Sequence, residues 1–262
     1  MKIEQKHTIG LSDVDFQFKS QVQAIVRYFQ EIATHHSTLV GVGPQVLFEK
    51  GVIWFLNRLE IEIFRYPLLH EDITVKTWSR GFKRFKGFRE YLMTSDQGQI
   101  ARGTSIWIFF DAVRNRISTI PPDIQSRYEV DGEKWFDAEI DAWNPCGKIQ
   151  PEHRIDISLR YSDFDVNRHV NNAVYFGFLE TLYDQMLRPD QKPIRNIKIR
   201  YNQEIERGQS QIQAGWKKVG DAYHFNIFSG QTLYADGEIT PTKSCADPVK
   251  PLCLSVPMPE SL

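Results

Sequence analysis

The sequence contains little cysteine and no long apolar run. Only three cysteines occur in 262 residues, Cys146, Cys245 and Cys253, and none forms a Cys-x-x-Cys pair. An odd number without paired spacing argues against a disulfide framework and a zinc site, so we predict reduced thiols and no metal centre. No apolar stretch reaches the roughly 20 residues that a membrane helix needs, and the first residues are too polar for a signal peptide. We therefore expect a cytoplasmic protein without an integral membrane segment.

An excess of charge of one sign is also missing. The chain has 32 Lys and Arg against 33 Asp and Glu, a formal net charge of -1. This balance argues against nucleic acid or an anionic membrane surface as the partner. The length and the 41% hydrophobic content allow one large core or two modest ones.

The sequence does contain an internal repeat. "SDVD" at Ser12–Asp15 returns 150 residues later as "SDFD" at Ser162–Asp165. In each copy a short polar stretch precedes apolar residues at spacings of three and four, which predicts an amphipathic helix. Gly41 and Gly43 would end the first helix, and Pro189 would end the second.

Strand-like sequence follows each predicted helix. In the first half, residues 51–66 alternate apolar and polar side chains, and residues 72–111 predict two or three long strands with a turn at Gly98. In the second half, four segments predict strands: residues 196–205, 210–220, 222–230 and 232–241.

Each half therefore combines one helix with an antiparallel sheet. A lone amphipathic helix on a sheet leaves apolar surface uncovered, and two such halves can cover each other. We predict an α+β fold with two tandem repeats in which a curled sheet wraps a helix, a double hotdog. The predicted ranges are 1–120 for the first repeat, 121–150 for a connector, 151–245 for the second repeat and 246–262 for an irregular tail.

The two repeats differ in their polar residues. Asn167 and His169 stand in the second half where Gln17 and Lys19 stand in the first. We therefore expect one active site, built mainly by the second half.

The aspartates of the repeat are common to both halves. Asp13 and Asp163 correspond, so we interpret both as structural turn residues. Asp165 is ambiguous on this argument, because Asp15 is its equivalent.

Asp165, Asn167 and His169 lie at positions i, i+2 and i+4. In extended backbone, this spacing puts the three side chains on one side. The flanking side chains would then point elsewhere: Val166 and Val170 into packing, and Arg168 to solvent. A solvated turn rich in Asp and Asn is the competing interpretation of the same run.

Asn171 or Asn172 can cap the helix that follows. The first backbone N–H groups of that helix would then lie next to the histidine, where they favour a developing negative charge. A base beside such an oxyanion site is a suitable arrangement for attack on a carbonyl.

Two segments resemble a known family. "SDFDVNRHVNNAVYFGFLET" and "FLNRLEIEIFRYPLLHEDITVKTW" resemble the acyl carrier protein (ACP) thioesterases, which include plant plastid and shorter bacterial enzymes. The resemblance covers roughly residues 2–239, and it implies that Asp165, Asn167 and His169 are catalytic or position the reacting groups.

The resemblance also implies a catalytic glutamate in a Tyr-x-x-Glu setting. "YNQEI" supplies Tyr201 and Glu204 for it. Many plant members have a cysteine directly after that glutamate, whereas this chain has Ile205. A cysteine nucleophile cannot act from that position, so direct hydrolysis is favoured.

The resemblance implies hydrolysis of fatty acyl-ACP to a free fatty acid and the carrier thiol, which ends chain elongation. No cofactor is expected, and a monomer or a homodimer would serve. Glu204 or His169 could activate the water, and direct attack by a carboxylate is the alternative. Acyl-CoA hydrolysis is the nearest competing function, followed by a hotdog dehydratase and a non-catalytic acyl-binding protein.

Two further features bear on substrate binding. The first half is rich in large apolar side chains that could line an acyl tunnel or form plain core: Ile53, Trp54, Phe55 and Leu56. The segment "SRGFKRFKGFRE" carries a basic cluster that could steer an acidic carrier protein or cover an exposed strand: Arg80, Lys83, Arg84, Lys86 and Arg89.

Overall fold

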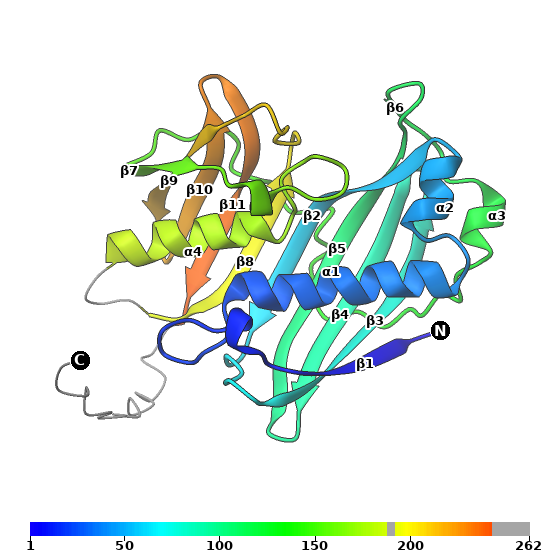
Figure 1. The fold of residues 1–262 in the computed structure, drawn as a ribbon, viewed down its shortest axis with the longest axis horizontal. Coiled ribbons are helices and arrows are strands. Elements are labelled where there is room, and N and C mark those ends of the chain that lie inside the picture. Colours follow the sequence, from blue (N-terminus) through cyan, green and yellow to red (C-terminus); the bar gives the residue numbers. More distant parts are fainter. Residues whose placement is uncertain (188–191, 243–262) are drawn as a thin grey trace, which may run out of the picture.

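A single antiparallel sheet runs through both halves of the computed structural model, and two long helices lie on one of its faces (Figure 1). The structure describes residues 1–187 and 192–242. The helices are α1 (Val22–Leu39), α2 (Pro44–Glu49), α3 (Pro122–Gln125) and α4 (Val174–Leu187). The strands are β1 (Ile3–Thr8), β2 (Val52–Ile63), β3 (Asp72–Lys83), β4 (Lys86–Ser95), β5 (Gly98–Asp111), β6 (Arg116–Ile117), β7 (His153–Ser158), β8 (Ile194–Tyr201), β9 (Gln211–Val219), β10 (Ala222–Ser229) and β11 (Thr232–Pro241).

The strand order shows the repeat. It is β1-β3-β4-β5-β2-β8-β11-β10-β9-β7, with the short β6 beside β5. Each half therefore has the same order, read outward from the centre, where β2 pairs with β8 from Arg58 opposite Arg200 to Glu62 opposite Asn196. One helix lies against each half-sheet, so the predicted α+β double hotdog is confirmed.

The predicted strands of both halves are present, and three further strands, β1, β7 and the two-residue β6, are not predicted by the sequence. β1 and β7 are the edge strands, and each is six residues long and alternates half-buried with exposed side chains. Their sequences, "IEQKHT" and "HRIDIS", contain too few apolar residues to predict strands. The predicted helix end at Pro189 and the predicted tail at 246–262 lie outside the described residues.

The helices follow their apolar spacing. In α1 the buried residues include Ile25, Phe29 and Ile32, which recur every three or four positions and face the sheet. Gly41, with φ +77°, follows the helix end in the left-handed conformation that glycine favours. Side chains of α1, α4 and strands of both halves share one core, which joins the two repeats.

Asp13 and Asp163 have the structural role predicted from the repeat. Both are buried, and each accepts a hydrogen bond from a backbone N–H three residues earlier, that of Gly10 or Arg160. Asp13 thereby closes a short turn just before Asp15, and Asp163 closes the equivalent turn just before Asp165.

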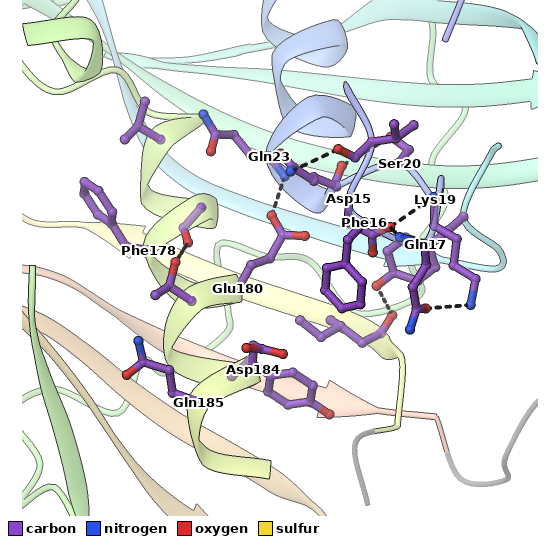
Figure 2. A pocket seen from close by; sticks show the side chains of 18 of the residues that line it. Asp15, Phe16, Gln17, Lys19, Ser20, Gln23, Phe178, Glu180, Asp184 and Gln185 are labelled. Carbon is purple, nitrogen blue, oxygen red and sulfur yellow. Dashed lines mark hydrogen bonds between the residues drawn. The ribbon is translucent and has the colours of Figure 1, made fainter. Parts of the chain in front are cut away.

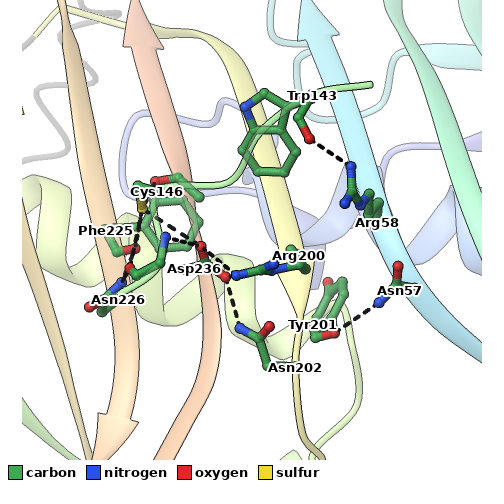
Figure 3. A network of polar contacts seen from close by, with 12 residues as sticks. Asn57, Arg58, Trp143, Cys146, Arg200, Tyr201, Asn202, Phe225, Asn226 and Asp236 are labelled. Atoms are coloured by element: carbon green, nitrogen blue, oxygen red, sulfur yellow. Dashed lines mark hydrogen bonds and ion pairs between the residues drawn. The ribbon is translucent and has the colours of Figure 1, made fainter. Parts of the chain in front are cut away.

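The connector between the halves covers the outer face of the sheet, opposite the helices (Figure 3). Arg58 donates to the carbonyl oxygens of three connector residues. The fully buried Asp236 accepts from Arg200, from Asn202 and from the backbone of Gly147. Arg200 lies on this face because the adjacent Tyr201 points into the core.

Cys146 belongs to this outer network. Its thiol contacts a carboxylate oxygen of Asp236 and nearby carbonyl oxygens. Burial raises the pKa of the Cys146 thiol to about 12, and the Asp236 charge adds to this effect. The group therefore stays protonated at neutral pH and is not an activated nucleophile.

Candidate functional site

Asp165 organises the loop that leads into α4. Its Oδ1 accepts hydrogen bonds from the backbone N–H of Asn167 at 2.8 Å and of His169 at 3.4 Å. Its own N–H donates to the carbonyl oxygen of His169 at 2.8 Å, and Arg168 has a positive φ of 65°. The run is therefore a closed turn.

The prediction of extended backbone in this run is wrong. A short Asp side chain can satisfy backbone N–H groups two and four residues ahead, and these bonds favour a turn over a strand. The expectation that Val166 packs inside is also wrong, because its side chain is 96% exposed. Val170 is buried and Arg168 is exposed, as expected.

His169 and Glu204 form a pair, although 35 positions of chain separate them. His169 Nδ1 lies 3.1 Å from Glu204 Oε2. The backbone fixes this approach, because the N–H of Val170 donates to the carbonyl oxygen of Ile205 at 2.9 Å. The glutamate inferred from the family resemblance therefore lies beside the histidine.

The surroundings of Glu204 raise the pKa of its carboxyl. Burial raises its pKa above the ordinary 4.5, His169 opposes this shift, and the charges of Asp165 and Glu206 add to it. The carboxyl is thus a stronger base than an exposed glutamate. A carboxylate of this kind beside an imidazole is suited to accepting a proton from water.

A cavity of about 640 Å³ extends from this loop into the first half of the chain. Asp165, Asn167 and Asn172 line it at the loop, whereas His169 and Glu204 are absent from its described lining. Most of the apolar lining comes from the first half and includes Val42, Leu47, Ile53, Trp54 and Phe82, and Phe164 and Val166 of the second half add to it.

The apolar residues singled out in the sequence divide between the cavity and the core. Ile53 and Trp54 line the cavity, whereas Leu56 is buried in the main core and Phe55 packs against it. Strand alternation turns neighbouring side chains to opposite faces, which accounts for part of this division.

Well-defined contacts fix the start of α4. Asn171 Oδ1 accepts from the N–H of Ala173 at 2.9 Å, so Asn171 caps the helix. The buried Tyr201 hydroxyl donates to the carbonyl oxygen of Asn172 at 2.9 Å. This helix start lies at the cavity and favours negative charge there.

The basic segment is only partly available to a partner. Arg89 is 7% exposed, and it contacts His36 Nδ1 at 2.9 Å inside the protein. Its inclusion in a docking surface is therefore wrong. Arg80 pairs with Glu139 and Glu90, and Lys86 pairs with Asp141. The two exposed members without an ion pair in the described part of the chain are Lys83 and Arg84.

Sequence reasoning missed one polar residue of the cavity. Gln30 of α1 lines it together with Asp165 and Asn171, and its Oε1 is buried without a hydrogen-bond partner among the described residues. The 150-residue offset places Gln30 opposite Glu180, and this change from acid to amide could have signalled it.

Neither a metal centre nor a membrane helix is found where the structure is described. Within residues 1–187 and 192–242, no three His, Cys, Asp or Glu side chains lie together as a metal site would require. No helix in those ranges is long and apolar enough to cross a membrane.

Comparison with known families identifies the two halves. Residues 1–128 match the sequence model of the acyl-ACP thioesterase N-terminal domain, and residues 147–233 match that of the C-terminal domain. The chain belongs to the acyl-ACP thioesterase family. Each family domain covers most of one helix-plus-sheet repeat, and the second contains the His169 loop and Glu204.

Plant members of the acyl-ACP thioesterase family are among the similar sequences. The chain is 24% identical over 223 residues to the chloroplastic oleoyl-acyl carrier protein thioesterase of Coriandrum sativum, covering 79% of this chain and 60% of that protein. It is 26% identical over 173 residues to the chloroplastic palmitoyl-acyl carrier protein thioesterase of Gossypium hirsutum, covering 61% and 42%. The chain thus spans about half the length of the curated relatives it matches.

Solved structures of the family share the fold. The acyl-ACP thioesterase of Bacteroides thetaiotaomicron superimposes with a TM-score of 0.79 at 20% identity, covering 91% of this chain and 97% of that one. The 12:0-ACP thioesterase of Umbellularia californica gives 0.77 at 20% identity, covering 92% and 98%. These similarities extend over both repeats and support the double hotdog fold.

Proposed function

We propose that the chain hydrolyses fatty acyl-ACP to a free fatty acid and the carrier thiol. The observation that carries this proposal is the cavity. Its first-half lining is largely apolar, and Asp165, Asn167 and the start of α4 also line it. An acyl chain fits the apolar part, which leaves its thioester at the polar end. The names of the plant relatives point to the same substrate class.

The proposed reaction is direct attack by water. The His169–Glu204 pair takes a proton from the water, and the oxygen attacks the thioester carbonyl carbon. The backbone N–H of Asn172, at the start of α4, holds the resulting oxyanion. The carbon–sulfur bond then breaks, and the thiol leaves as a thiolate because its pKa is about 8.5. Asp165 holds the loop, and Asn167 orients the substrate.

The half-buried, protonated Cys146 and the residue at position 205 support this route. Ile205 directly follows Glu204 and is fully buried, so no thiol lies at that position. Cys146 belongs to the outer face. A covalent acyl-cysteine intermediate therefore has no candidate nucleophile among the described residues of the site.

The carrier is proposed to dock through charge. Lys83 and Arg84 are exposed at the β3–β4 turn, next to strands whose residues line the cavity. An acidic carrier protein would meet them before its acyl chain enters. Acyl-CoA hydrolysis is the second candidate, because the CoA phosphates would meet the same two cations.

The test compares carriers. Initial rates of thiol release from acyl-ACP and acyl-CoA, each over a range of chain lengths, give kcat/KM for both. The proposal expects higher kcat/KM with acyl-ACP and a raised KM for acyl-ACP in the Lys83→Glu, Arg84→Glu variant. A charge-reversed Lys217→Glu variant, at an exposed position of β9 in the other half of the sheet, is the control. Equal or faster hydrolysis of CoA esters would move the function to acyl-CoA.

The other expectations remain predictions. A dehydratase would release water from a 3-hydroxyacyl substrate without thiol release, and an acyl-binding protein would release neither. Two further expectations also remain predictions: a cytoplasmic location and a monomeric or homodimeric state. The preferred acyl chain length has to be measured.

A further inference from the structure

The first half contains a copy of the catalytic loop (Figure 2). Asp15 Oδ1 accepts from the backbone N–H of Gln17 at 2.7 Å and of Lys19 at 3.1 Å, as Asp165 does in the second half. The N–H of Asp15 donates to the carbonyl oxygen of Lys19 at 2.8 Å, and Phe18 has a positive φ of 60°. The two halves therefore present the same backbone at two related positions.

A carboxylate occupies the helix start in this first-half copy. Glu180, from α4, accepts from the N–H of Val22 at 2.6 Å and from the N–H of Gln23 at 3.1 Å. Figure 2 shows its side chain directed at the beginning of α1. The backbone N–H groups and the helix dipole explain why an anion binds there. Glu180 thus marks, within this protein, where a carboxyl oxygen accepts from the helix start beside the loop.

Gln30 takes the corresponding place in the second half. It lies on α1, 150 residues before Glu180, and it lines the cavity with Asp165, Asn171 and Asn172 at the start of α4. In the described part of the chain, no carboxylate accepts from the N–H of Asn172, and the N–H of Ala173 donates to Asn171 Oδ1. The position that holds an anion in one half therefore holds a neutral amide in the other.

The oxygen of this amide has no partner inside the protein. Gln30 Oε1 is buried and accepts no hydrogen bond among the described residues. Buried polar atoms are nearly always paired, so an unpaired acceptor at a cavity wall points to a donor that comes with the reactants. In a thioester hydrolase the attacking water is such a donor.

We propose that Gln30 is a further catalytic residue. Its neutral amide leaves the N–H of Asn172, at the start of α4, free for the thioester oxygen, and its Oε1 accepts one hydrogen bond from the attacking water. The other proton of that water passes to the His169–Glu204 pair while the oxygen attacks the carbonyl carbon and the carbon–sulfur bond breaks. This inference rests on the proposed hydrolysis.

The charge at position 30 explains why one half is active and the other is not. A carboxylate at Gln30 would fill the α4 start as Glu180 fills the α1 start, and it would repel the oxyanion. The loss of the histidine in the first half, where Lys19 stands, removes the base from a site whose oxyanion position is already filled.

Two reciprocal exchanges test the inference. Gln30→Glu places a carboxylate at the α4 start and should lower kcat about 100-fold at pH 8, the scale of a lost oxyanion contact. Gln30→Ala should lower kcat about 10-fold with little change in KM. This loss is smaller than the roughly 100-fold contribution of a general acid or base, because Gln30 only orients the water. Glu180→Gln makes the reverse exchange in the first half and should leave kcat unchanged, because that site is not used.

The pH dependence separates a catalytic role from a structural one. Relative to wild type, the Gln30→Glu enzyme should regain activity as the pH falls from 8 to 6, because protonation removes the added charge. Binding of dodecanoate, an anionic product analogue, gives a readout without turnover. Gln30→Glu should weaken it about 10-fold or more at pH 8, whereas Glu180→Gln should not.

The results distinguish a failure of the role proposed for Gln30 from a failure of the proposed hydrolysis. Full kcat and unchanged dodecanoate binding in Gln30→Glu and Gln30→Ala, with an active wild type, would overturn the role of Gln30 and leave the proposed hydrolysis standing. A wild type that releases no thiol from any acyl-ACP or acyl-CoA would overturn the proposed hydrolysis and the role of Gln30 with it.

Discussion

Glu180 should make the stability of the protein depend on pH. Burial raises the pKa of its carboxyl from the ordinary 4.5 to about 7, and the N–H groups of Val22 and Gln23 offset part of this shift. Between these two values the folded chain binds a proton that the unfolded chain has lost. Folding stability due to this group is therefore full below pH 4.5 and decreases as the pH rises through 7.

The Glu180→Gln variant isolates this contribution. A shift from 4.5 to about 7 corresponds to about 3 kcal/mol at roughly 1.4 kcal/mol for each pKa unit. Glutamine carries no such proton, so the variant's free energy of unfolding relative to wild type should rise by about 3 kcal/mol between pH 5 and pH 8. All other titrating groups are common to both proteins and cancel in this difference.

Urea unfolding at pH 5, 6, 7 and 8 measures the effect. Glu49→Gln, at an exposed position of α2, is the matched control and should follow wild type. Parallel pH curves for wild type and Glu180→Gln would show that the carboxyl is not held as described. They would mean that the pKa of Glu180 is the same in the folded and the unfolded chain.

Three further predictions concern the site. Tyr201→Phe removes the hydroxyl that donates to Asn172, and it should cost about 1 kcal/mol in urea unfolding and lower kcat; unchanged values would show that the α4 start is fixed without it. Burial raises the pKa of Glu204 above 4.5, and the carboxyl must be deprotonated to act as the base. We therefore expect kcat/KM to fall in acid with a midpoint above pH 4.5. A midpoint at or below pH 4.5 would exclude Glu204 as the base. Ala33→Leu narrows the cavity and should shift thiol release toward shorter acyl chains, whereas an unaltered chain-length profile would place the acyl chain elsewhere.

The repeat made most of the fold predictable. The match between residues 12–15 and 162–165, followed each time by a helical spacing, was enough to predict two helix-plus-sheet halves. The sequence does not predict the edge strands β1 and β7, because their short sequences are largely polar. An edge strand pairs on one side only, so few of its residues need to be apolar.

The roles of Asp165, Asn167, His169 and Glu204 remain predictions, whereas the geometry of their loop can be compared with the structure. The i, i+2, i+4 spacing predicted an extended run, whereas the hydrogen bonds of Asp165 close a turn. The pairing of His169 with Glu204 depends on β8 ending beside the loop, and local sequence does not contain that information.

Local sequence does not predict the positions of Arg89 and Gln30. Arg89 lies close in sequence to exposed basic residues. Strand alternation and an irregularity in the β3–β4 register nevertheless turn its side chain toward His36. Gln30 lies in an ordinary amphipathic helix, and its importance appears only when the two repeats are superimposed.

The rate of thiol release from acyl-ACP by wild type and by His169→Ala tests the central claim most directly. His153→Ala, at an exposed histidine on β7, serves as the control for a lost imidazole. The account predicts rapid release by wild type and by the control, and a loss of about 100-fold or more in kcat for His169→Ala, at the scale of general acid–base catalysis. Full activity in His169→Ala would contradict the assignment of this loop as the site of hydrolysis.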